Sequence, residues 1–328
     1  MEWLPFDPAP TSGYPRRSAW NRGVAPLSDE ILARWELTPE AIVSGGSASI
    51  VMRVSRADGS PAVLKVSYPH EEARFEAVGL GALGPQLACR VLLQDTSDWA
   101  LLLEQLSPGA SLGESVLRQE LSIADAAAAA AGLRARVGGT PVPRGLPSLE
   151  ALTAHYAADA AAWTIEHADA IGRLGVAGLV GDAVRLLGGP ALAHPLDRVL
   201  LHGDFNPSNI LASGSAHGAD PGADAWRLID PKPAVGDPAF DLWQLVAQLG
   251  DPLDGPDPEA QFAATLAAVA EASGVDAGRI ARWGFARTGL SVVWAVADGD
   301  SWEAPIQARA LRAWAPLLGY APQRTRSV

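Results

Sequence analysis

The sequence of 328 residues has little of several features that define other classes of protein. Its single cysteine, Cys89, excludes an internal disulfide, and core packing is the role we expect for it. Because the sequence holds no run of about 18 uncharged apolar residues, it predicts no membrane span. The first residues lack the basic start and the apolar stretch of a signal peptide. We therefore expect a cytoplasmic protein without a membrane partner.

Positive charge is also scarce, with 25 basic against 37 acidic residues and a formal net charge of −12. Such a field repels nucleic acid and favours cationic partners, although simple solubility explains the same balance. The composition, 48% hydrophobic and 19% charged, is that of a packed globular chain. This length allows one large domain or two lobes.

The first hundred residues carry the pattern of a small sheet. Apolar runs at 50–54 and 62–66 flank the turn signal Ala57-Asp58-Gly59-Ser60, which predicts a hairpin. Further strands are expected at 90–94 and 99–103. Helices are expected at Glu71–Leu83 and, in a short piece, around Asp29–Trp35.

From residue 112 onward most of the chain is rich in Ala and Leu and has a helical pattern. We expect helices over 115–137, 149–172, 176–188, 239–250, 258–273, 276–297 and 302–317. The predicted fold class is α+β with two lobes. A β-rich N-lobe would cover 1–103, a hinge 104–108, and a helical C-lobe 109–328.

Short strands return between residues 198 and 231, and this segment carries the candidate chemistry. The strands at 210–212 and 226–229 should pair antiparallel across their connecting loop, which brings Asn209 beside Asp230. Both offer oxygen, the ligand atom that Mg²⁺ prefers. Asp204 lies in the loop before them and could face a substrate hydroxyl, as phosphoryl transfer requires. A polar surface turn followed by an Asp-Pro turn is the alternative.

Three motifs together resemble the aminoglycoside phosphotransferases, most closely the streptomycin 6-kinase and hydroxyurea phosphotransferase branch. They are His202-Gly203-Asp204-x-x-x-x-Asn209, Ile229-Asp230-Pro231-Lys232-Pro233, and Gly236-Asp237-Pro238-Ala239-Phe240-Asp241-Leu242. The resemblance is strong over 198–245 and weaker at 34–37, at the Lys65 strand and at 283–294. It implies a protein-kinase-like fold. It also implies ATP- and Mg²⁺-dependent transfer of phosphate to a hydroxyl of a small polar, cationic compound, as in the inactivation of a streptomycin-like antibiotic.

The resemblance also assigns roles to residues. Asp204 would be the catalytic base or the carboxylate that orients the hydroxyl, and Asn209 and Asp230 would hold Mg²⁺. Lys65 would contact the α- and β-phosphates and pair with a helix glutamate. Glu76 is the glutamate we expect, although Glu72 lies one turn earlier on the same face.

Other parts of the site follow from the same resemblance. The loop around Ser47 would cover the nucleotide phosphates, although a plain turn explains it too. Glu104 and Leu106 would lie in the connector that binds adenine. Asp241 would anchor the catalytic loop, and His202 would pack beneath it. Lys232 would either neutralise phosphate or be exposed, and Phe205 and Asn206 depart from the Leu and His common in the family.

In this family the acceptor lies between the catalytic loop and the last helices. The candidates here are Asp237, Trp294, Asp298, Asp300, Trp302 and Glu303. Acids and tryptophans suit a cationic aminocyclitol, whereas a helix end with solvated acids is the alternative. A metabolite kinase acting on a sugar or amino alcohol, and a nucleotide-binding pseudokinase, are the competing functions. The complete set of Lys65, Asp204, Asn209 and Asp230 argues against the pseudokinase.

Overall fold

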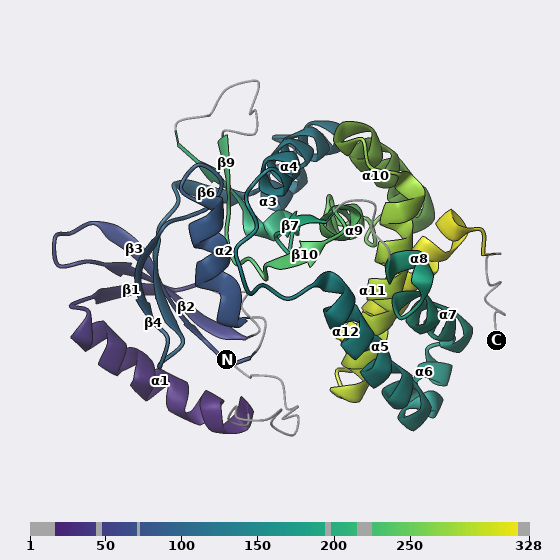
Figure 1. The fold of residues 1–328 in the computed structure, drawn as a ribbon, viewed down its shortest axis with the longest axis horizontal. Helices are drawn as coiled ribbons and strands as arrows, with labels where there is room; N and C mark the ends of the chain where they lie inside the picture. Colours follow the sequence, from purple (N-terminus) through teal and green to yellow (C-terminus); the bar gives the residue numbers. More distant parts are fainter. Residues whose placement is uncertain (1–16, 44–47, 71–72, 194–197, 215–224, 321–328) are drawn as a thin grey trace.

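The computed structural model describes residues 17–43, 48–70, 73–193, 198–214 and 225–320. A five-stranded antiparallel sheet forms one lobe, with strand order β1-β2-β3-β5-β4 (Figure 1). Its strands are β1 (Thr38–Ile42), β2 (Ser49–Ser55), β3 (Pro61–Ser67), β4 (Val91–Asp95) and β5 (Ala100–Glu104). The predicted hairpin joins β2 to β3, and the Asp58 carboxylate accepts a hydrogen bond from the Ser60 backbone at 2.9 Å.

Two helices pack on this sheet. Helix α1 (Arg17–Arg34) runs along it in Figure 1 and is longer than the short helix expected around Asp29–Trp35. Its Ile31 is buried in a cluster with Leu64 of β3 and Leu102 of β5. On the side of the second lobe, η1 (Ala73–Phe75) leads into α2 (Glu76–Leu83).

The second lobe is mainly helical. Its helices are α3 (Leu112–Leu117), α4 (Ile123–Gly138), α5 (Leu149–Glu166), α6 (Ala168–Arg173), α7 (Ala177–Leu187), α8 (Pro190–Ala193), α9 (Ala239–Gln248), α10 (Pro258–Ser273), α11 (Ala277–Ala297) and α12 (Glu303–Trp314), followed by η4 (Ala315–Leu318). Two expected helices are each divided. The Ser122 side chain caps the start of α4, which breaks 115–137, and His167 ends α5, which breaks 149–172.

Short strands lie in the middle of the molecule, at the junction of the two lobes (Figure 1). β7 (Val199–Leu201) pairs with β10 (Ala234–Gly236). β8 (Ile210–Ser213) pairs with β6 (Pro108–Ser111) on one side and with β9 (Trp226–Leu228) on the other. The sequence did not predict β1, β6 or β10, because each is short and mostly lacks β-branched residues.

The chain after α2 joins the two lobes through backbone hydrogen bonds. The Cys89 amide donates to the Leu228 carbonyl at 3.1 Å, and the Leu228 amide donates to the Leu87 carbonyl at 2.8 Å. Cys89 itself is buried, as predicted. Burial raises the pKa of its thiol to about 12.

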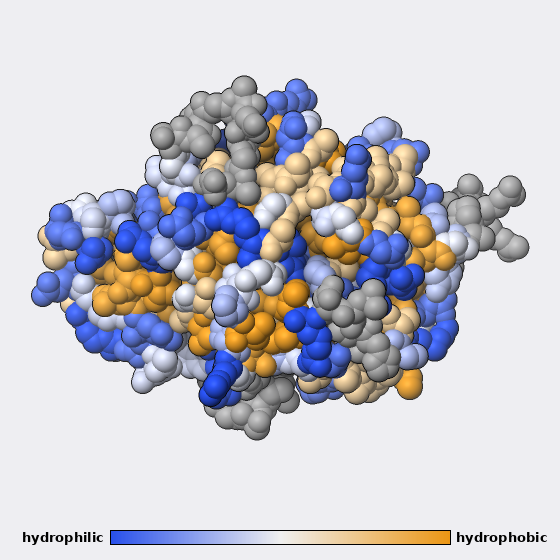
Figure 2. Space-filling view, turned by 45° about the horizontal axis from the view of Figure 1, so that its top comes forward, coloured by the Kyte–Doolittle hydropathy of each residue, from blue (hydrophilic) through white to orange (hydrophobic). Residues whose placement is uncertain are grey.

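The surface is mixed in polarity. On the face shown in Figure 2, hydrophobic residues appear in separate patches among hydrophilic ones. Among the helices that the structure describes, none is long and apolar enough to cross a membrane.

Candidate active site

The loop after β7 is held from below by a buried carboxylate. Asp241, in the first turn of α9, accepts hydrogen bonds from the backbone amides of His202 at 3.0 Å and Gly203 at 2.9 Å. Its Oδ2 also lies 3.0 Å from Nε of Arg134, and both side chains are buried. Asp241 therefore anchors the loop from inside the helical lobe, as predicted.

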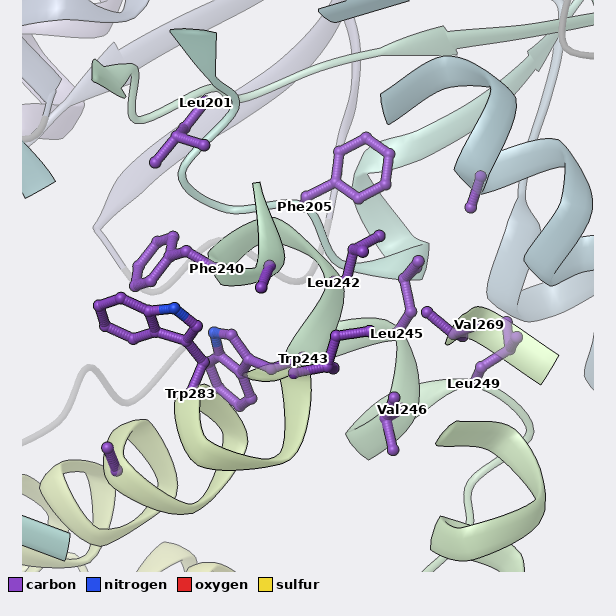
Figure 3. Packing of buried hydrophobic residues seen from close by; sticks show 14 of the residues in the cluster. Leu201, Phe205, Phe240, Leu242, Trp243, Leu245, Val246, Leu249, Val269 and Trp283 are labelled. Atoms are coloured by element: carbon purple, nitrogen blue, oxygen red, sulfur yellow. The ribbon is translucent and has the colours of Figure 1, made fainter. Parts of the chain in front are cut away.

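His202 packs beneath the loop, also as predicted. Its ring is fully buried, contacts the ring of Phe205 edge-to-face at 5.7 Å, and has Nε2 3.1 Å from the Ile229 carbonyl. Burial lowers the pKa of His202 despite the acids nearby, so the ring is neutral at pH 7. In Figure 3 the side chains of Phe205 and Leu242 lie in the same hydrophobic core.

Gly203 is required by geometry. It has φ +82°, and a Cβ on it would collide with the carbonyl oxygen of Lys232. The Lys232 amide also donates to the His202 carbonyl at 2.7 Å. The catalytic loop and the segment after β9 are therefore fixed against each other by backbone contacts.

Asp204 follows this glycine and is surrounded by donors. Its Oδ1 accepts from Gln244 at 2.8 Å and from Asn206 at 3.1 Å, and its Oδ2 lies 3.2 Å from Lys232 Nζ. Burial raises the pKa of Asp204, but Lys232 and the Gln244 hydrogen bond outweigh burial and leave the pKa below its usual value. The carboxylate is therefore ionised at neutral pH.

Asn209 and Asp230 lie at the ends of paired strands. Ile210 pairs with Leu228, and the Ile229 amide donates to the Asn209 carbonyl at 3.0 Å, so Asp230 follows one residue past the partner of Asn209. The strands pair antiparallel as predicted, but the register differs by one residue, so that Ile229 rather than Asp230 lies opposite Asn209. Asp230 has φ +55°, a left-handed conformation that non-glycine residues seldom adopt.

A buried lysine connects the two lobes at this point. Nζ of Lys65, on β3, lies 2.7 Å from Oε1 of Glu76 and 2.5 Å from Oδ1 of Asp230. Burial lowers the pKa of Lys65, but its attraction to Glu76 and Asp230 outweighs burial and raises the pKa above the usual value. Burial raises the pKa of Asp230, but the attraction of Lys65 outweighs burial and keeps this pKa below its usual value.

These residues line one cavity of about 540 Å³ between the lobes. Lys65, Glu76, Asp204, Asn209 and Asp230 all reach its wall. The side-chain amide of Asn209 donates to the Asp204 carbonyl at 3.0 Å, which leaves its oxygen available. One amide oxygen and one carboxylate suit Mg²⁺, which keeps waters or phosphate oxygens as its other ligands.

The remaining nucleotide-site predictions have different outcomes. Ser47 and Glu72 lie outside the described residues. Glu104 ends β5, and its carboxylate contacts Arg90. Leu106 follows in the segment between β5 and β6. Neither Glu104 nor Leu106 lines the cavity that contains Lys65.

A second cavity, of about 780 Å³, adjoins the first at Asp204. Asp204 and Lys232 line both cavities. Of the acceptor candidates, Trp294 and Glu303 line this second cavity. The larger cavity thus reaches Asp204 but not Lys65.

The other acceptor candidates do not line it. Asp237 is buried, and its Oδ2 accepts from Arg279 at 2.5 Å and from Trp283 at 2.7 Å, so it ties β10 and α9 to α11. Trp283 packs edge-to-face on Phe240 at 5.1 Å, as Figure 3 shows. Asp300 caps α12 by accepting from the Trp302 and Glu303 amides. Trp302 is exposed, and Asp298 ends α11.

Three contributors were missed by sequence reasoning. Gln244 and Asn206 bind the Asp204 carboxylate, and Arg287 of α11 lines the larger cavity. Gln244 and Arg287 lie on helices far along the chain from the loop. Asn206 could have been identified from the sequence, because an Asn just before Pro207 is a typical cap of a short helix.

Comparison with known proteins shows that this chain is similar to one family of kinases. A sequence model described as aminoglycoside/hydroxyurea antibiotic resistance kinase matches residues 34–299. A streptomycin 6-kinase of Streptomyces griseus is 31% identical over 297 residues, which cover 90% of this chain and 91% of that protein. A hydroxyurea phosphotransferase of Kitasatospora aureofaciens is 33% identical over 274 residues, covering 83% and 73%.

Solved structures show the same fold. The choline kinase LicA from Streptococcus pneumoniae has a TM-score of 0.60 at 14% identity, covering 90% of this chain and 99% of that one. The GDP complex of a mutant aminoglycoside 2'-phosphotransferase has a TM-score of 0.60 at 13% identity, covering 90% and 96%. At these identities the likeness concerns the kinase-like fold.

Proposed function

Because the chain belongs to the aminoglycoside/hydroxyurea antibiotic resistance kinase family, we propose that it is an ATP- and Mg²⁺-dependent O-phosphotransferase that inactivates a small polar antibiotic. One observation carries the proposal: Asp204 lies on the wall shared by two cavities. The smaller cavity contains a lysine and two oxygen ligands suited to a metal-bound nucleotide. The larger one would receive the acceptor hydroxyl.

The roles in this reaction follow from the contacts. Lys65, fixed by Glu76, would bind nucleotide phosphates as a positive charge. Asn209 and Asp230 would hold Mg²⁺, which when bound neutralises charge on the phosphates. Asp204 would accept a hydrogen bond from the acceptor hydroxyl and align it with the phosphate that is transferred.

Lys65 and Asp230 form an ion pair that nucleotide binding would rearrange. Their atoms lie 2.5 Å apart, and Mg²⁺ would compete with Lys65 for the same carboxylate. We expect Lys65 to turn to the phosphates when the metal takes Asp230. The Glu76 contact would keep the lysine at the cavity wall during this exchange.

The test is transfer of phosphate from ATP to defined acceptors. The names of the relatives make streptomycin and hydroxyurea the first compounds to test. Purified protein with ATP and Mg²⁺ is expected to produce ADP and an acceptor heavier by one phosphate in mass spectrometry. Asp204→Asn should abolish this product, while Asp169→Asn, which changes an exposed acid of α6, should not.

The outcomes separate the competing functions. Product formation that survives in Asp204→Asn would remove this residue from the reaction. Turnover of sugars or amino alcohols without turnover of any antibiotic would assign the protein to metabolism instead. Binding of ATP with no hydrolysis or transfer would indicate a pseudokinase.

A further inference from the structure

The larger cavity contains a cation enclosed by aromatic rings. The guanidinium carbon of Arg287 lies 5.4 Å from the ring centre of Tyr156, 5.5 Å from that of Phe240 and 5.3 Å from that of Trp294. Arg287 and all three rings line the cavity. Three aromatic faces stabilise the charge and hold the guanidinium in place.

Among the described residues this arginine has no counter-ion. No carboxylate oxygen of the described ranges lies within 4.0 Å of its nitrogens. The two acids on the cavity wall have other partners: Asp204 contacts Lys232, and Glu303 accepts from Gln307 at 2.5 Å. The aromatic cage therefore holds a net positive charge at the acceptor end of the site.

Two donors of Arg287 are also without partners. Its Nε and Nη1 are shielded from solvent and make no hydrogen bond to any residue within the described part of the chain. Shielded donors are normally satisfied, and leaving one unpaired is unfavourable, more so when the group is charged. The faces of the three rings supply no oxygen acceptor. Nη2 of Arg287 is not among the shielded nitrogens, so an oxygen in the cavity would reach the guanidinium there first.

We propose that Arg287 binds a carbonyl or carboxylate oxygen of the acceptor, and that the site thereby selects acceptors carrying such an oxygen over polycations. The proposal rests on the proposed function, since it takes the larger cavity as the acceptor site. Arginine donates to such oxygens in a planar fork, so it fixes orientation as well as charge. A cationic acceptor would instead meet a like charge in a site partly closed to water.

The composition of the cavity agrees with this class of acceptor. The side chains of this cavity that can carry a charge near neutral pH are Asp204, Lys232, Arg287, Glu303 and two histidines, His70 and His155. The Asp204–Lys232 contact cancels one charge of each sign, which leaves Arg287 and Glu303 facing the same space. An excess of acid, which a polycation would require, is absent from the residues that line this cavity.

The experiment measures acceptor binding without nucleotide, by isothermal titration calorimetry. The probes are hydroxyurea, which carries a carbonyl; serine and ethanolamine, which differ by one carboxylate; and streptomycin, a polycation. Arg287→Met keeps an unbranched apolar stem of similar thickness and removes the guanidinium with its charge and donors. Arg287→Lys keeps the charge and loses the fork. Arg282→Met, on the same helix but outside the cavity lining, is the matched control.

We expect Arg287→Met to weaken binding of hydroxyurea and serine at least about tenfold, the effect of losing a hydrogen bond to a charged group. Arg287→Lys should show a smaller loss, and Arg282→Met none. Binding of ethanolamine should not weaken, and that of streptomycin should be equal or tighter in Arg287→Met. Unfolding curves establish that each variant is folded.

Two results would overturn the proposal. One is wild-type protein that binds neither oxygen-bearing probe. The other is a folded Arg287→Met variant whose preference between serine and ethanolamine is unchanged. Failure of the proposed function would look different, because Mg²⁺-dependent ATP hydrolysis lost in Asp204→Asn reports on the transfer site without any acceptor.

Discussion

Replacement of Asp241 by asparagine tests how the catalytic loop is held. The carboxylate is fully buried, pairs with Arg134 at 3.0 Å, and accepts from two loop amides. Asparagine has nearly the same shape but no charge, and it replaces one acceptor oxygen by a donor. The substitution therefore leaves a buried guanidinium without its counter-ion and one loop amide facing another donor.

The size of the effect follows from this burial. Removing one partner of a buried ion pair costs about 3–5 kcal/mol, because the other charge stays buried. We expect Asp241→Asn to lower the free energy of unfolding by about that amount, measured by urea denaturation with an unchanged m-value. The rate of phosphate transfer should fall as well, because the amides of His202 and Gly203 position Asp204.

A second variant separates stability from positioning. In Asp241→Asn combined with Arg134→Met the buried cation is gone, so the double variant should regain most of the lost stability. Its activity should stay low, since one loop amide still faces a donor. The exposed control Asp169→Asn should change stability by less than about 0.5 kcal/mol. The reasoning is refuted if Asp241→Asn costs less than about 1 kcal/mol, or if the double variant is no more stable than the single one.

Three further predictions concern other parts of the site. Gly203→Ala should destabilise the protein by more than about 1 kcal/mol and reduce activity, because a Cβ at this positive φ meets the Lys232 carbonyl; wild-type urea curves would contradict this. The pKa values of Asp204 and Asp230 are lowered in the folded protein, so these groups stabilise it above the unfolded value of about 3.9, and this contribution is lost as pH falls through the lower folded values. Asp204→Asn should therefore flatten the acid limb of a stability–pH curve, and an unchanged limb would argue against the shift. Cys89, with a pKa of about 12, should not react with a thiol reagent at pH 8 until urea unfolds the chain; rapid labelling of the native protein would show that it is accessible.

The sequence predicted that Asn209 and Asp230 lie close together, because the geometry that brings them together is local. Asn209 and Asp230 flank two strands joined by one loop, and antiparallel pairing by itself brings the strand ends together. Glu76 required more, since it reaches Lys65 only when α2 packs against the sheet. Its helical position nevertheless narrowed the choice to two glutamates one turn apart.

The acceptor end could not be predicted in the same way. Trp294 lines the larger cavity, but hydrogen bonds from Arg279 and Trp283 hold Asp237 away from it. Arg287 has no local signal, because one arginine on a helix of 21 residues is more often a surface group. Its environment depends on rings from three different helices, α5, α9 and α11, and only their packing brings these together.

The charge state of Asp204 determines how this residue can act on the hydroxyl of an acceptor. A carboxylate with a lowered pKa is a weak base, so it orients a hydroxyl better than it removes a proton. Phosphoryl transfer through a loose transition state tolerates this, since the nucleophile gains little charge before the phosphate arrives. Correct placement of the hydroxyl then becomes the main requirement, and a single hydrogen bond to Asp204 leaves the rest of the molecule free to rotate. A second fixed contact removes that freedom. Arg287, held by three rings in the same cavity, is placed to supply it. The acceptor that we propose is accordingly defined by two groups, a hydroxyl for Asp204 and an oxygen for Arg287, and loss of the second contact should lower the rate of transfer as well as the affinity.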